Sequence, residues 1–293
     1  MKRVAMAAAL VLAGAVAVPA QELAAPGPDI HIVRNGRVER GVRCAAERPS
    51  AETMAEADRI VSEMIAEGRV GGDAPAAVTV PVVFHVIHNG TEGNVPEAWL
   101  DAQVQVLNNA FRNTGFSFTK ARVNRVQDKR AFTGCYSNQN FKRSLADDPA
   151  HNLNFYTCKP KGNILGYAYL PWSYSEENWH HGVVVLYDTL PGGAAAPYNE
   201  GDTGTHEVGH YLGLYHTFER GCQEPGDAVS DTPFEASAAF GCPVGRDTCS
   251  QPGLDPILNF MDYTDDPCMN TFSGEQGTRM QAVTAQYKPS LGQ

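Results

Sequence analysis

The spacing of apolar residues predicts alternating strands and helices from residue 78 onward. Residues 78–90 are β-branched, alternate in polarity and end at Asn89-Gly90, a pattern typical of a strand followed by a turn. Residues 96–112 place large apolar side chains at helical spacing and predict an amphipathic helix. Further strands are expected at residues 116–126, 152–159, 164–172 and 182–190. This order of elements is typical of an α+β protein.

The last third of the chain has a different character. A short helix is expected at residues 201–213, and residues 218–293 are rich in Gly, Pro, Asp and Cys. We expect irregular loops pinned by disulfides, followed by a final helix at residues 274–286.

The first residues resemble a secretory leader rather than part of a fold. Lys2 and Arg3 precede an apolar run at residues 4–18, and small residues follow at Pro19-Ala20. The run is shorter than the ~20 residues that span a bilayer. We expect a signal peptide at residues 1–20, cut after Ala20 or Ala17, and a secreted product. The alternative is an uncleaved anchor.

Residues 21–72 are charged and predict a separate pro-segment before a catalytic domain at residues 73–293. Ser50 is a candidate N-cap for one helix at residues 50–67. The glycine-rich stretch that follows contains Arg69 and resembles a protease-accessible hinge. The alternative is an ordinary N-terminal helix and loop.

Composition narrows the possible partners. The chain has 293 residues and is 43% hydrophobic, so it can bury a sizeable core. Its formal net charge is -10. The acidic balance argues against nucleic acid or an anionic membrane as a partner. We expect a monomer.

One segment, HEVGHYLGLYH, concentrates three of the nine histidines. On a helix, His206 and His210 share a face, and Gly213 allows a sharp turn that brings His216 to the same point. Three nitrogen ligands with an open fourth position are typical of catalytic zinc, and Glu207 lies next to that position. The alternatives are core histidines and a non-catalytic zinc site.

This segment resembles the zinc-binding consensus of the metzincin metalloproteases. The sequence NFMDYTDDPC fits the downstream Met-turn of that clan, with Met261 as its methionine. Thr217 after the third histidine, DAVSDTP at residues 227–233 and Tyr263 are similar to the pappalysin family. The resemblance runs from residue 78 to the C-terminus. It implies a zinc endopeptidase acting on proteins or peptides, with a twisted mixed sheet, a backing helix, a zinc-binding helix and a disulfide-stapled C-terminal subdomain.

The resemblance also implies residue roles. Glu207 is expected to act as general base on a zinc-bound water. Tyr263 is the candidate donor to the developing oxyanion, the alternative being a core tyrosine. Four further histidines are not spaced from this segment as metal ligands would be, and we interpret them as strand or loop residues: His85, His88, His180 and His181.

Seven cysteines leave at least one without an internal partner. The pappalysin pattern implies the disulfides Cys222–Cys249 and Cys242–Cys268, which leaves Cys135–Cys158. The unpaired Cys44 follows Arg43, as in the pro-segments of pappalysin relatives, although Ala45 replaces their glycine. We expect Cys44 to occupy the open zinc position in a zymogen. The alternatives are a free thiol and an intermolecular disulfide.

The acidic loop after the zinc helix is a candidate calcium site. The resembling enzymes hold a structural calcium there, and we assign it to Asp227 with Ser230 and Thr232. A solvated acidic loop is the alternative. Asp265 and Asp266 follow the Met-turn and would favour Arg or Lys after the scissile bond, unless they only form a turn.

Two other functions remain possible at this point. A binding module that lost catalysis would have lost Glu207 or a ligand, and neither is lost. A non-peptidase zinc hydrolase would have no reason for a Met-turn at Met261.

Overall fold

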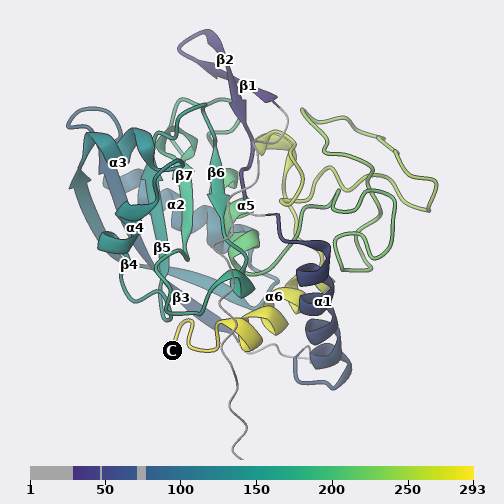
Figure 1. The fold of residues 1–293 in the computed structure, drawn as a ribbon. Coiled ribbons are helices and arrows are strands. Elements are labelled where there is room, and N and C mark those ends of the chain that lie inside the picture. The colour runs from purple at the N-terminus through teal and green to yellow at the C-terminus, as the bar shows by residue number, and fades with distance from the viewer. Residues whose placement is uncertain (1–28, 47, 71–76) are drawn as a thin grey trace, which may run out of the picture.

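The computed structural model describes residues 29–46, 48–70 and 77–293 (Figure 1). The expected leader at residues 1–20 lies outside the described residues, as does most of the glycine-rich hinge. Within the described part of the chain, no helix is long and apolar enough to cross a membrane.

A five-stranded sheet forms the centre of the fold, in the order β4-β3-β5-β7-β6. Its first four strands run parallel, and the edge strand β6 runs antiparallel to β7. The strands are β3 (Val78–His88), β4 (Phe116–Gln127), β5 (Leu153–Cys158), β6 (Gly166–Ala168) and β7 (Val183–Leu186). The mixed sheet confirms the predicted α+β class, and each strand overlaps a segment expected from its apolar pattern.

The two faces of the sheet are covered by different helices (Figure 1). Phe84 of β3 belongs to the main core with Leu107 and Val208, which come from α2 and α5. Ile87 points the other way and packs with Phe132 of α3. This alternation is what a central strand requires. The helices here are α2 (Glu97–Ala110), α3 (Lys129–Gly134), α4 (Asn140–Leu145) and α5 (Asp202–Tyr211). The sequence pattern did not predict α3 or α4.

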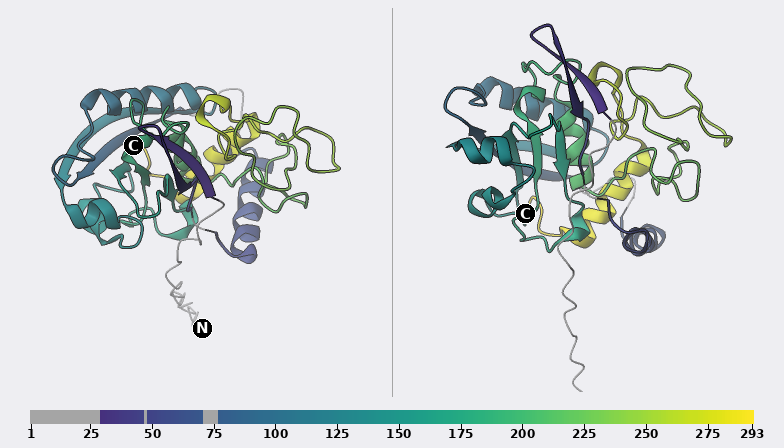
Figure 2. Two further views of the ribbon diagram at one scale, coloured as in Figure 1. Left: turned by 90° about the horizontal axis from the view of Figure 1, so that it is seen from above. Right: turned by 45° about the horizontal axis from the view of Figure 1, so that its top comes forward.

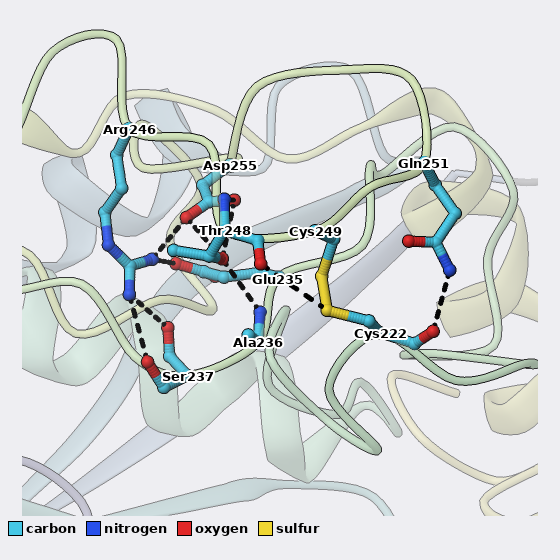
Figure 3. Close-up of a disulfide and its surroundings, with 9 residues drawn as sticks. All are labelled: Cys222, Glu235, Ala236, Ser237, Arg246, Thr248, Cys249, Gln251 and Asp255. Carbon is cyan, nitrogen blue, oxygen red and sulfur yellow. Dashed lines mark hydrogen bonds and ion pairs between the residues drawn. A yellow bond between two sulfur atoms is a disulfide. The ribbon is translucent and has the colours of Figure 1, made fainter.

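After α5 the chain forms loops as far as α6 (Gly274–Tyr287), the last helix of the fold. Three short 3-10 turns lie within residues 171–268, two before α5 and one after it. The turns are η1 (Pro171–Ser173), η2 (Tyr187–Thr189) and η3 (Asp266–Cys268). The disulfides join Cys135 to Cys158, Cys222 to Cys249 and Cys242 to Cys268, the pairs that were expected. Beside Cys222–Cys249, Arg246 makes ion pairs with Glu235 and Asp255 (Figure 3).

The N-terminal segment contains more structure than the single predicted helix. β1 (Asp29–Arg34) and β2 (Arg37–Val42) form an antiparallel hairpin before α1 (Ala51–Ala66). Asn35 and Gly36 both have positive φ, 51° and 74°, as a two-residue hairpin turn of the Asn-Gly kind requires. The Ser50 side chain caps α1 by accepting from the Thr53 amide. The hairpin and α1 lie at different sides of the rest of the fold (Figure 2).

Candidate metal centre

The helix α5 delivers two histidines, and the turn after it delivers the third. The helix begins after Gly201, with Asp202 in its first turn, where a carboxylate is favoured by the helix dipole. It ends before Gly213, whose φ is +100°. A Cβ at Gly213 would lie 2.5 Å from Cγ1 of Val283 on α6, so the position needs glycine for both its backbone angle and its close packing.

The three imidazoles converge on one point. Ring centroids of His206 and His210 are 4.8 Å apart, and those of His210 and His216 are 4.5 Å apart. All three residues are buried. The structure therefore brings together the three ligands that the spacing predicted.

The hydrogen bonds behind the rings fix which nitrogen faces inward. Nδ1 of His206 lies 2.7 Å from the Phe260 carbonyl oxygen, and Nδ1 of His210 lies 2.8 Å from that of Leu214. Because a carbonyl only accepts, each Nδ1 must carry the proton. Each Nε2 then offers a lone pair to the centre, and burial lowers the pKa of His210 to about 4, which keeps the ring neutral.

These lone pairs need a cation. Nε2 of His210 and Nε2 of His216 are 3.1 Å apart, and Nε2 of His206 is buried without a hydrogen-bond partner among the described residues. Neutral imidazoles that donate their other N–H to a carbonyl are the usual metal ligands. The site therefore fits a divalent metal such as zinc.

A fourth donor reaches the same point from the N-terminal segment. The ligand atoms of Cys44, His206, His210 and His216 all lie within 4.8 Å of one another. Cys44 is the free cysteine of the described chain and is buried. Burial, followed by the nearby Glu207 carboxylate, raises the pKa of the thiol, so only a metal would hold it there as thiolate.

The segment around Cys44 is held along the edge strand of the sheet. The amide of Ala45 donates to the Gly166 carbonyl at 3.0 Å, and the amide of Leu165 donates to the Val42 carbonyl at 2.8 Å. Val42 pairs in parallel with Ile164. The alanine that replaces the expected glycine thus fits its place, buried against β6.

Glu207 faces the same centre and is fully buried. Burial raises the pKa of its carboxyl group to about 8, an effect that the adjacent Cys44 thiol and Arg43 oppose. Gly166 on β6 makes room for it, because a Cβ there would lie 2.7 Å from Oε1 and 2.6 Å from Cγ of Glu207. Sequence reasoning missed Gly166, although a glycine inside a strand pattern signals such a close approach.

Tyr263 and Met261 lie where the resemblance implied. The Tyr263 hydroxyl is 3.1 Å from Nε2 of His216. Met261 lies under α5, since a Cβ at Gly209 would be 2.4 Å from its sulfur, and its carbonyl accepts from the Thr217 amide at 3.3 Å. The Thr217 hydroxyl donates at 2.8 Å to the buried Glu235, a contact that the sequence did not predict.

Arg43, next to the thiol, is buried between Thr203, Asp266 and Tyr198, and we call these surroundings the Arg43 pocket. Arg43 is fully buried, and its guanidinium donates to the Thr203 hydroxyl at 3.0 Å. The guanidinium also lies 3.8 Å from the Asp266 carboxylate and over the ring of Tyr198. Burial raises the pKa of both Asp266 and the neighbouring Asp202, and the guanidinium opposes this effect. The sequence motif contained Arg43, but its role was not predicted.

The predicted calcium residues are close together, although their side chains have other partners. Asp227 is 5% exposed, and its Oδ2 has no partner among the described residues, whereas Glu224, Ser230 and Asp231 of the same loop are exposed. Its Oδ1 accepts from the Thr232 hydroxyl at 2.7 Å. The Ser230 hydroxyl instead donates to Glu275 at 2.8 Å.

His85, His88, His180 and His181 are not part of the group of candidate metal ligands. Nε2 of His85 on β3 lies 2.8 Å from Oδ1 of Asn154, and His88 ends the same strand. His180 and His181 precede β7, where His180 stacks on Tyr174.

A buried helix that carries two histidines under a mixed sheet, with a third histidine after a glycine turn, defines a metal-dependent peptidase of the metzincin class. The sequence model of the peptidase family described as pregnancy-associated plasma protein-A matches residues 135–285. The chain belongs to this family, the pappalysins, and is a metalloendopeptidase.

Fungal relatives agree with this assignment. An extracellular metalloprotease of Sordaria macrospora is 42% identical over 254 residues, which is 84% of this chain and 88% of the relative. One from Neurospora crassa is 41% identical over 256 residues, covering 84% and 88%. These relatives do not support the alternatives of an inactive binding module or a non-peptidase hydrolase.

Solved structures agree as well. A mutant of promirolysin from Tannerella forsythia has a TM-score of 0.71 and 26% identity, covering 84% of this chain and 94% of the other. Mature mirolysin in complex with a cleaved peptide has a TM-score of 0.65 and 29% identity, covering 74% and 98%.

Proposed function

We propose that the chain is the latent precursor of a secreted zinc endopeptidase, in which Cys44 occupies the fourth position of a zinc site formed by His206, His210 and His216. One observation carries this proposal: the thiol and the three imidazoles share a single point, within 4.8 Å of one another. One sulfur and three nitrogens suit tetrahedral zinc.

In the active enzyme the thiol would give way to water. A zinc ion held by the three histidines would lower the pKa of that water and polarise the substrate carbonyl. Glu207 would accept a proton from the water and return it to the leaving amine. Its burial beside the thiol and its raised pKa suit a group that must both accept and return a proton.

Tyr263 is proposed as the oxyanion donor. Its hydroxyl lies 3.1 Å from Nε2 of His216, one of the three histidines that would hold the metal, and would be available there to donate to a substrate oxygen. A donor placed for the transition state contributes to turnover more than to binding.

The division at residues 21–72 and 73–293 has independent support. The match to promirolysin covers 84% of this chain, whereas the match to mature mirolysin covers 74%. The difference is consistent with a pro-segment that the mature enzyme loses. The extracellular relatives and the signal-like residues 1–20 support secretion.

The substrate is a protein or peptide, and we propose that a basic residue follows the scissile bond. The pocket that receives Arg43 supports this, because it offers Asp266, the Thr203 hydroxyl and the Tyr198 ring to a guanidinium.

Structural calcium at Asp227 is proposed from its buried, unpartnered oxygen.

The proposed mechanism is tested by Glu207→Ala. The full chain is cut in the hinge by an added protease, and the cut product is assayed on a peptide that contains arginine. We expect an equal zinc content and a loss of turnover by about 10²-fold or more, whereas Glu177→Gln on the surface leaves turnover intact. Full activity of Glu207→Ala would refute the role of Glu207.

A further inference from the structure

The helix α1 packs on a surface of the proposed catalytic domain that includes Tyr215, the residue before His216. Met54 packs with Leu170 and Tyr215, and Val61 packs with Val283 of α6. Trp172 borders both contacts. We call the surface under α1, formed by Leu170, Trp172, Tyr215, Val283, Arg220 and Arg279, the α1-binding face.

A single carboxylate of α1 satisfies both arginines of this face. The Arg279 guanidinium donates to Oδ1 of Asp58 at 2.7 Å, and the Arg220 guanidinium donates to Oδ2 at 3.0 Å. The side chain of Asp58 is 13% exposed and that of Arg279 is 2% exposed. Asp58 and Arg279 thus form a largely desolvated charge pair, and removing one partner of such a pair weakens binding far more than removing an exposed charge.

The arginines themselves belong to the catalytic domain and are held in place without α1. Arg279 also donates to the Gly213 carbonyl at 3.0 Å, and Arg220 donates to the Gly226 carbonyl at 2.7 Å. Both guanidinium groups lie over the ring of Tyr215, at 4.6 Å and 5.5 Å from its centroid. Two preorganised cations would therefore lack their carboxylate once α1 leaves.

From this geometry we infer that the α1-binding face becomes an exosite of the mature enzyme, which binds an amphipathic acidic helix in a protein substrate. The required pattern is the one α1 presents: an apolar residue, a carboxylate four positions later, and an apolar residue three positions after that, as in Met54, Asp58 and Val61. These positions share one helix face. The inference rests on the proposed removal of the pro-segment.

The site is placed to influence cleavage. Tyr215 immediately precedes the ligand His216, and Arg279 holds the turn at Gly213. In this chain Ser50, the N-cap of α1, lies six positions after Cys44, which reaches the three histidines. A helix bound here thus presents the adjoining extended chain to the cleft, and it raises the local concentration of that chain there.

Kinetics with matched substrates test the exosite. One substrate is a short arginine-containing peptide. The two others are the same peptide extended by residues 50–67, which begin six positions after the cleavage point in one substrate and end six positions before it in the other. For at least one orientation we expect KM to fall about tenfold with little change in kcat. Equal KM values for all three substrates overturn the exosite, whereas failure to cleave the short peptide would count against the proposed function instead.

Substitutions in the helix of the substrate separate this contact from general charge. Asp58→Asn should abolish the gain in KM, while Glu63→Gln, which removes the same charge from the exposed side, should keep it. The ratio of kcat/KM between helical and short substrates should also fall towards one in the Arg220→Ala enzyme. Equal effects of the two helix substitutions would overturn the pairing.

Binding without turnover provides a second readout. A fluorescent peptide of residues 50–67, which lacks Arg43 and Cys44, is titrated with the cut Glu207→Ala enzyme and followed by anisotropy. We expect saturable binding that Asp58→Asn weakens about tenfold. No binding at enzyme concentrations above the measured KM of the helical substrate would overturn the inference.

Discussion

The hydroxyl of Tyr263 lies 3.1 Å from Nε2 of His216, the nitrogen that faces the metal cluster. Since this nitrogen would be bound to the metal, the hydroxyl is free to donate to a substrate oxygen. Tyr263→Phe keeps the ring, which packs against Phe218. We expect kcat to fall about 10²-fold with KM nearly unchanged, as for a lost oxyanion donor. Steady-state kinetics on the cut enzyme check this, and an unchanged kcat would return Tyr263 to a packing role.

Gly166 makes room for Glu207, the proposed general base. In Gly166→Ala the new methyl group would lie 2.7 Å from Oε1 of Glu207, a distance at which one of the two must move. We expect a large loss of kcat with normal zinc content, because the carboxylate is displaced from the water. Gly134→Ala in α3 is the control, since no atom lies within 4 Å of its added Cβ and its φ is not positive. Equal turnover of both variants would show that Glu207 tolerates displacement.

Asp266 is predicted to set the preference for a basic residue after the scissile bond. Its carboxylate faces Arg43 within a buried pocket. In Asp266→Asn we expect kcat/KM for an arginine substrate to fall about 30-fold or more, corresponding to ~2 kcal/mol, while an alanine substrate changes little. Asp247→Asn, which removes an exposed charge, is the control. A parallel fall for both substrates would mean that Asp266 supports the fold and does not select the substrate.

Calcium is predicted to stabilise the C-terminal loops through Asp227. Calcium present at about 100-fold above its Kd would add ~2.7 kcal/mol to the free energy of unfolding. Chelation at saturating zinc should therefore lower the melting temperature of the wild type and leave Asp227→Asn unaffected. Asp247→Asn changes an exposed charge in the same subdomain and should still respond to calcium. A wild-type melting curve that ignores chelation would argue against the site.

Much of the fold could be predicted from local pattern. Strands such as β3 and helices such as α2 show their own periodicity, and the metal ligands occupy one short segment, so no tertiary information was needed. The β1–β2 hairpin was missed although Asn35-Gly36 between alternating apolar residues is a strong hairpin signal. The short helices α3 and α4 have six residues each, too few for a periodic pattern to emerge.

The remaining features depend on contacts between distant segments. Arg43 meets Thr203 across 160 residues, and Asp58 meets Arg279 across 221. No local pattern encodes such pairs, since they depend on how the N-terminal segment lies across the finished catalytic domain. The sequence suggested Cys44 as a zinc ligand only because it was the cysteine left unpaired and because it follows Arg43, as in the pro-segments of pappalysin relatives.

The most direct test of latency is the absorption spectrum of the uncut chain with cobalt in place of zinc. A thiolate bound to cobalt gives sulfur-to-metal charge-transfer absorption, which histidine and water ligands do not give. We predict this absorption for the uncut wild type, and its loss both in uncut Cys44→Ser and after the hinge is cut and the pro-segment removed. A wild-type spectrum identical to that of Cys44→Ser, at equal cobalt content, would contradict the assignment of Cys44 as the fourth ligand.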